Sequence, residues 1–137
     1  PFGYGMTYSK FEYSDAKIKK SGKNYIATIT VKNVGNSNAK EVVELYVSAP
    51  KGKLAKPAME LKAFAKTREL KPGESERLAM TFTNYDLASY DMTAHSWITD
   101  AGTYQAKFAA SSEDIRQTVA FKADHHTVLC HDVLNMK

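Results

Sequence analysis

Apolar and polar residues alternate along several stretches of the chain, which is the pattern of strands with one buried face. The clearest case is residues 25–32, where every second residue from Tyr25 to Val31 is apolar and most intervening positions are polar. Residues 43–48 and 77–82 repeat the alternation. Three strands, each with one face toward a core, are therefore predicted.

Further strands are predicted on both sides of this set. Residues 104–110 alternate in the same way, and the run 118–121 can pair with them as a final hairpin across 111–114. Another strand, near the start of the chain, is indicated by Phe11, Tyr13 and Ile18. The chain therefore contains about seven short strands.

The segments between the strands carry residues that preset a turn or accept a positive φ, as in 21–22, 33–36, 71–74 and 100–102. Pro72-Gly73 suits the central positions of a type II turn. The only helical signal is one turn at 86–90, which Asp86 can cap and which we interpret as a corner between sheets. This organisation favours an all-β, immunoglobulin-like or fibronectin type III-like antiparallel sandwich. Because the Cys and Trp signature of antibody domains is absent, we favour the fibronectin type III-like variant.

Composition narrows the class of protein. A chain of 137 residues fits one domain, and its 43% hydrophobic and 25% charged residues are ordinary for a soluble fold. No apolar run approaches the roughly 20 residues that a membrane helix needs, and the net charge of +4 is dispersed. Neither a membrane nor a nucleic acid is therefore a predicted partner. The single Cys130 excludes an internal disulfide and leaves the redox compartment open.

The two ends differ from the sandwich, which we expect to span residues 9–122. Residues 1–8 are irregular yet rich in apolar side chains, an unfavourable composition to leave in water. We expect this aromatic leader to pack on a preceding domain through Phe2, Tyr4, Met6 and Tyr8. Since the chain starts at Pro1 without a signal segment, we interpret it as a processed or excised piece. The tail, residues 123–137, has no predicted role.

The sequence gives little support for catalytic or metal-binding residues. The paired carboxylates fall on wet strand faces or in turns, which favours solvated surface over catalysis: Glu12 with Asp15, Glu41 with Glu44, and Asp86 with Asp91. Cys130 has no nucleophile elbow or orienting acid beside it. Four His and Cys residues lie within 125–131, but their spacing fits no standard zinc site. No catalytic residue, metal ligand or cofactor is predicted.

Aromatic residues suggest a different function, because exposed rings stack on the faces of sugars. The candidate glycan-stacking residues are Tyr46, Tyr85, Tyr90 and Trp97. Alternatively, Trp97 and Tyr90 fill the edge of the sandwich and Tyr46 meets a neighbouring domain. The discriminating property is whether the rings are coplanar and face the solvent.

Several segments, in order along the chain, resemble a known family. Residues 1–11 resemble the lead into the C-terminal fibronectin-like domain of family 3 glycoside hydrolases, the β-glucosidase and β-xylosidase group. The resemblance covers residues 1–122 and continues in 31–35, 41–47, 57, 60–64, 70–75, 86–91, 97, 102–104 and 111–116. Ala63 stands where the family often has Gly, and Ser89 where it often has an aromatic residue.

The resemblance implies a parent that is a retaining, exo-acting β-glycosidase acting on terminal β-linked sugars such as β-glucosides. In such parents the Asp nucleophile lies on a TIM barrel and the acid/base carboxylate usually on an α/β domain, both upstream, so no catalytic residue carries over to this chain. The implied function is a non-catalytic accessory domain that packs on and stabilises the catalytic domains of the same polypeptide. The resemblance also implies a periplasmic or extracellular location. The alternatives are a carbohydrate-binding module and a cell-surface adhesion domain.

Overall fold

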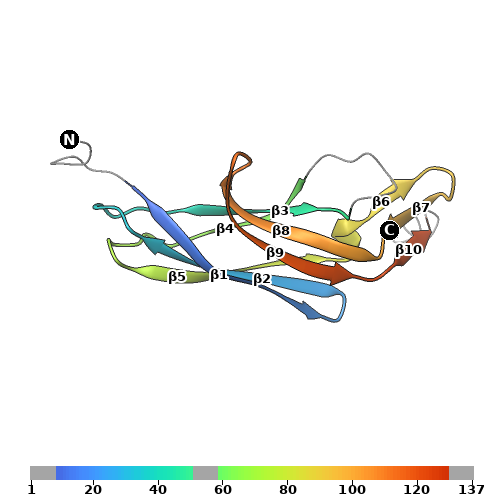
Figure 1. Ribbon diagram of the computed structural model, residues 1–137, viewed down its shortest axis with the longest axis horizontal. Helices are drawn as coiled ribbons and strands as arrows, with labels where there is room; N and C mark the ends of the chain where they lie inside the picture. Colours follow the sequence, from blue (N-terminus) through green and yellow to red (C-terminus); the bar gives the residue numbers. More distant parts are fainter. Residues whose placement is uncertain (1–8, 51–58, 130–137) are drawn as a thin grey trace.

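The structure is a computed structural model that describes residues 9–50 and 59–129. Two antiparallel sheets lie face to face and form the body of the molecule (Figure 1). The three-stranded sheet has the order β1-β2-β5, with bounds Phe11–Ser21, Asn24–Asn33 and Ser75–Thr83. The four-stranded sheet has the order β4-β3-β8-β9, with bounds Glu60–Lys66, Val42–Ser48, Gly102–Ser111 and Asp114–Ala123. The predicted antiparallel sandwich is thus confirmed.

The alternating strands bury the side chains that their period assigns to the core. Along β2, Tyr25, Ala27, Ile29 and Val31 are all at most 1% exposed. The largest group in the core is aromatic: Tyr25 stacks on Phe82 with ring centroids 5.2 Å apart, and Tyr104 stacks on Phe121 at 5.7 Å. Two further contacts join the sheets, because the ring of Phe121 on β9 lies 5.2 Å from Tyr25 on β2 and 5.6 Å from Phe82 on β5.

Tyr13 and Ile18 lie five residues apart, so in a regular strand their side chains would point to opposite faces. Both point inward because β1 contains a β-bulge. The register against β2 shifts between Ser14 and Lys17, and Asp15 adopts a positive φ of 55°. The extra residue reverses the alternation, so the side chain of Ile18 packs against the same core as the side chain of Tyr13. The predicted first strand is therefore present, but its sequence did not predict the bulge.

Two predicted turns are confirmed. The N–H of Glu74 donates to the carbonyl of Lys71 at 2.9 Å, and Gly73 between them has a φ of 88°. A positive φ at the third position and proline at the second are the features of a type II turn. The predicted final hairpin is formed by β8 and β9, which meet at Ser111 and Asp114.

A third sheet at one end of the sandwich was not predicted (Figure 1). Its order is β10-β7-β6, with bounds His126–Leu129, Ser96–Thr99 and Ser89–Asp91. The single helical turn predicted at 86–90 is present as a shorter 3-10 turn at Tyr85–Leu87, followed by β6. The predicted cap, Asp86, is wrong, because Asp86 lies inside the turn and Asn84 precedes it. The expected sandwich boundary at residue 122 falls inside β9, and part of the following tail forms β10.

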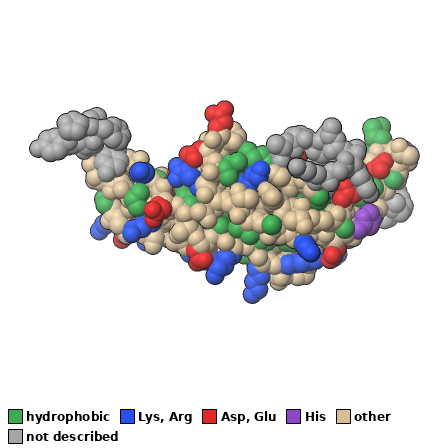
Figure 2. Space-filling model, in the orientation of Figure 1, with side chains coloured by type: hydrophobic (Ala, Val, Ile, Leu, Met, Phe, Trp, Pro, Cys, Tyr) green, Lys and Arg blue, Asp and Glu red, His purple; other side chains and the backbone are tan. Residues whose placement is uncertain are grey.

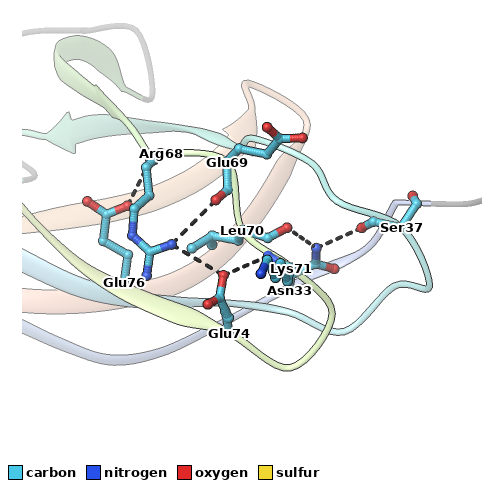
Figure 3. Close-up of polar contacts among 8 residues, drawn as sticks. All are labelled: Asn33, Ser37, Arg68, Glu69, Leu70, Lys71, Glu74 and Glu76. Carbon is cyan, nitrogen blue, oxygen red and sulfur yellow. Dashed lines mark hydrogen bonds and ion pairs between the residues drawn. The ribbon is translucent and has the colours of Figure 1, made fainter.

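A buried amide ties two loops together at the opposite end of the sandwich (Figure 3). The side chain of Asn33 is fully buried, and its Nδ2 donates to the carbonyls of Ser37 at 2.9 Å and Leu70 at 2.8 Å. Its Oδ1 accepts from the N–H of Gly35 at 2.9 Å. The segment 33–36, predicted as a turn, is thus held by the side chain of its own first residue.

The buried hydroxyl of Tyr104 leads us to expect lower stability in alkali. Burial, followed by the nearby charge of Asp100, raises the pKa of Tyr104 to about 12, while an unfolded tyrosine has a pKa of about 10. A pKa that is raised in the folded state stabilises the fold fully below pH 10, and this stability is lost as the pH rises toward 12. We expect a loss of up to about 3 kcal/mol, measured by urea denaturation between pH 9 and 12.

The control is Tyr104→Phe, which has no phenol to ionise. Tyr13 also has a raised pKa, because it is buried and its hydroxyl donates to Glu41, so some pH dependence should persist in the variant. An alkaline loss of the same size in Tyr104→Phe and in the unsubstituted chain would contradict the assignment to Tyr104.

Candidate functional site

Three of the four candidate glycan-stacking residues come together on the third sheet and the turn before it. The ring of Trp97 lies 5.2 Å from Tyr90 and 5.8 Å from Tyr85, between ring centroids. Tyr85 and Tyr90 are 47% and 38% exposed, so both rings face the solvent in part. The interplanar angles to Trp97 are 51° and 65°, so the three rings do not form a flat platform.

The fourth candidate, Tyr46, lies elsewhere. It sits on the outer face of the four-stranded sheet, opposite Leu61 on β4 and Lys107 on β8. Its hydroxyl donates to Glu44 Oε1 at 2.8 Å. The expected position on the polar-alternating face of its strand is confirmed, but Tyr46 belongs to a different surface from the Trp97 group.

Two hollows border the third sheet. One has a volume of about 560 Å³ and is lined by Lys23, Asn24, Thr83, Asn84, Tyr85, His126 and Val128. The other has a volume of about 420 Å³ and is lined by Ser89, Tyr90, Asp91, Met92, Ile98, Asp100 and His125. Each hollow places a half-exposed tyrosine beside amide, carboxylate or imidazole groups, a combination that suits a polar ligand with a flat apolar face.

The candidate carboxylates make local hydrogen bonds. Five of them accept one from a nearby residue: Asp15 from Arg77, Glu41 from Tyr13, Glu44 from Tyr46, Asp86 from the Thr83 N–H, and Asp91 from the Thr93 N–H. A general acid in glycoside hydrolysis needs a raised pKa. Hydrogen bonds from the Lys71 N–H and the Arg68 side chain lower the pKa of Glu74, and Arg116 lowers the pKa of Asp114. The environments of Glu74 and Asp114 therefore favour the ionised form of these two carboxyl groups.

An apolar face on the four-stranded sheet was missed by the sequence analysis. We define the apolar face as Val42, Leu61, Phe64 and Ile115, which are 40%, 49%, 70% and 40% exposed. Leu61 and Phe64 were noted only as part of the family resemblance. In a regular strand, residues three apart point to opposite sides. A register shift lets Phe64 pair with Glu44 and Leu61 pair with Tyr46, so both side chains point outward.

Some predicted residues lie outside the described part of the chain. These are the leader residues Phe2, Tyr4, Met6 and Tyr8, together with Cys130 and His131. Within the described residues, no three His, Cys, Asp or Glu side chains gather where they could hold a metal ion. Across residues 9–50 and 59–129, no helix has the length and apolar composition needed to cross a membrane.

Comparison with known proteins gives the context of this domain. The family model of the fibronectin type III-like domain matches residues 41–112. Beta-glucosidase A of Butyrivibrio fibrisolvens is 39% identical over 135 residues, which cover 85% of this chain and 16% of that protein. A beta-glucosidase of Ruminococcus albus is 37% identical and is matched over 94% of this chain and 14% of its own length. The chain thus spans about a sixth of the length of these curated relatives.

The solved structures that resemble this chain are also β-glucosidases. Beta-glucosidase 3B of Thermotoga neapolitana, solved in complex with glucose, superposes with a TM-score of 0.83 at 40% identity, over 93% of this chain and 18% of that one. The beta-glucosidase of Kluyveromyces marxianus superposes with a TM-score of 0.82 at 32% identity, over 93% of this chain and 16% of that one. The chain therefore belongs to the fibronectin type III-like domain family, in the form that occurs as one domain of family 3 glycoside hydrolases.

Proposed function

We propose that this chain is a non-catalytic accessory domain of a β-glycosidase that hydrolyses terminal β-linked sugars such as β-glucosides, and that it packs on and stabilises the catalytic domains. The observation that carries the proposal is the size relation: a complete sandwich with its own core corresponds to about a sixth of each β-glucosidase that it matches. The local hydrogen bonds of the candidate carboxylates support a structural role for this sandwich.

The alternative function, glycan binding, rests on the half-exposed Tyr85 and Tyr90 beside Trp97. A flat stacking platform would favour this function, and the tilted rings do not supply one. We therefore rank glycan binding second.

The test of the proposed function compares the isolated chain with the full-length enzyme that carries it. The 137-residue chain should not hydrolyse an aryl β-glucoside. Deletion of residues 9–129 from the full-length enzyme should shorten its activity half-life at elevated temperature at least tenfold, because the covered surface of the catalytic part would become exposed to water.

Three results would count against the proposal. Hydrolysis by the isolated chain would contradict a non-catalytic role, and an unchanged half-life after the deletion would contradict a stabilising one. Saturable shifts of the Trp97 indole in an NMR titration with gluco- or xylo-oligosaccharides would favour glycan binding instead.

A further inference from the structure

Exposed large apolar side chains of the described residues gather at two places. Three of them, Tyr85, Tyr90 and Met92, lie at or beside the third sheet. The other four form the apolar face on the outer side of the four-stranded sheet. A contiguous apolar patch on a soluble protein usually marks a surface that another body covers.

The outer face of the three-stranded sheet has the opposite character. At its centre Arg77 donates to the hydroxyls of Thr28 and Thr30, both at 2.8 Å, and to Asp15 Oδ2 at 3.0 Å. Figure 2 shows lysine and arginine side chains along the lower edge of the molecule, and on the upper side hydrophobic side chains with charged ones beside them. A sandwich exposed to water on both sides would be polar on both outer faces, so the contrast singles out one face.

The apolar face continues across the strands of the sheet. Register pairs Phe64 on β4 with Glu44 on β3, Glu44 with Ala109 on β8, and Ala109 with Ile115 on β9. Val42 precedes Glu44 by two residues and so lies on the same side of β3. The four exposed side chains therefore share one surface, with Phe64 the most exposed of them at 70%.

Polar groups lie within this surface and at its edge. Tyr46 donates to Glu44 at 2.8 Å within it, and Lys62 forms an ion pair of 2.9 Å with Glu60 at one end of β4. An apolar centre with a polar rim is the usual anatomy of a protein interface, and depletion of charge at the centre is its compositional signal. On the outer face of the four-stranded sheet, Val42, Leu61, Phe64 and Ile115 would supply the apolar contacts of such an interface, and the hydrogen-bonded Tyr46–Glu44 pair among them would supply polar ones.

We propose that the apolar face is the surface on which the catalytic part of the same polypeptide packs, an inference that rests on the proposed function. The occupant follows from the length of the relatives, in which about five-sixths of the chain lies outside this domain. A tethered partner meets the face at a high effective concentration, so four moderately exposed apolar residues suffice as the centre of an interdomain interface.

The experiment measures the activity half-life of the full-length enzyme at elevated temperature for Phe64→Ser and Leu61→Ser. The control is Lys32→Ser, which removes a long exposed side chain from the outer face of the three-stranded sheet. Phe64→Ser should shorten the half-life at least fivefold, and Leu61→Ser should act in the same direction. Lys32→Ser should leave it within twofold. In the isolated chain, Phe64→Ser should leave the urea midpoint nearly unchanged, because the side chain makes few contacts there.

The outcomes separate the inference from the function on which it rests. If deletion of residues 9–129 shortens the half-life and Phe64→Ser does not, the stabilising function stands and the assigned face is wrong. An equal effect of Lys32→Ser would also overturn the assignment. If the deletion itself has no effect, both proposals fail. A dimer of the isolated chain that Phe64→Ser dissociates would assign the face to a second copy instead.

Discussion

Replacing Phe82 with alanine is expected to lower the free energy of unfolding by about 3–5 kcal/mol. Phe82 is 1% exposed, stacks on Tyr25 at 5.2 Å and meets the edge of Phe121 at 5.6 Å. Removing the ring leaves a cavity where the two sheets meet, and the neighbouring rings of both sheets lose packing contacts. A chain of this length has about 7–20 kcal/mol of stability, so the loss is a large share of the total.

The measurement is urea denaturation of the isolated chain, followed by tyrosine fluorescence or circular dichroism. Phe82→Leu is the matched control, because it keeps most of the apolar volume and should cost roughly half as much. A loss below about 1 kcal/mol for Phe82→Ala would show that the aromatic group is not central to the core.

Replacing Asn33 with alanine is expected to cost about 3 kcal/mol, although the substitution removes no large apolar surface. The Ser37 carbonyl would lose the hydrogen bond that it accepts from the fully buried amide, and the Gly35 N–H would lose the Oδ1 to which it donates. The Leu70 carbonyl would keep the bond from the Ala39 N–H at 3.0 Å. The substitution removes three hydrogen bonds made by a fully buried side chain, each worth about 1 kcal/mol, and their sum accounts for the expected loss.

The more informative variant is Asn33→Asp. The ionised carboxylate cannot donate to the carbonyls of Ser37 and Leu70, so at pH 7 the variant should be less stable than Asn33→Ala. Burial and the two carbonyls would raise the pKa of the new carboxyl group in the folded state, so its stability is present at low pH and is lost as the pH rises. Equal stability of Asn33→Asp at pH 4 and pH 7, after correction for the unsubstituted chain, would contradict this role.

Strands and turns with strong local patterns could be predicted from the sequence. The side chains of a strand alternate between its two faces, so the alternation from Tyr25 to Val31 identifies the buried face without knowledge of its partner. The turn at Pro72-Gly73 is likewise predicted by its own residues, because proline presets one φ and glycine accepts the positive φ at the next position. The resemblance of the ordered motifs to family 3 glycoside hydrolases was confirmed by the family model and the relatives.

The third sheet could not be predicted from local pattern. Its strands are three or four residues long, too short for alternation to stand out. Strand β10 reaches β7 only after the β8–β9 hairpin has intervened in the chain. This sheet brings Tyr85, Tyr90 and Trp97 together. The sequence identified each of these residues as a candidate, but it could not predict the angles between their rings.

The sequence by itself determined the fold class, the main strands, the turn at Pro72-Gly73 and the family, because each of these is written in short-range spacing or in ordered motifs. Only the tertiary structure decided which exposed side chains share a surface. The register shift opposite Leu45 and Tyr46 turns Leu61 and Phe64 to the same side, and the bulge in β1 turns Tyr13 and Ile18 inward together. A one-residue shift reverses every later side chain of a strand, and cross-strand pairing, rather than the strand's own sequence, sets where that shift occurs.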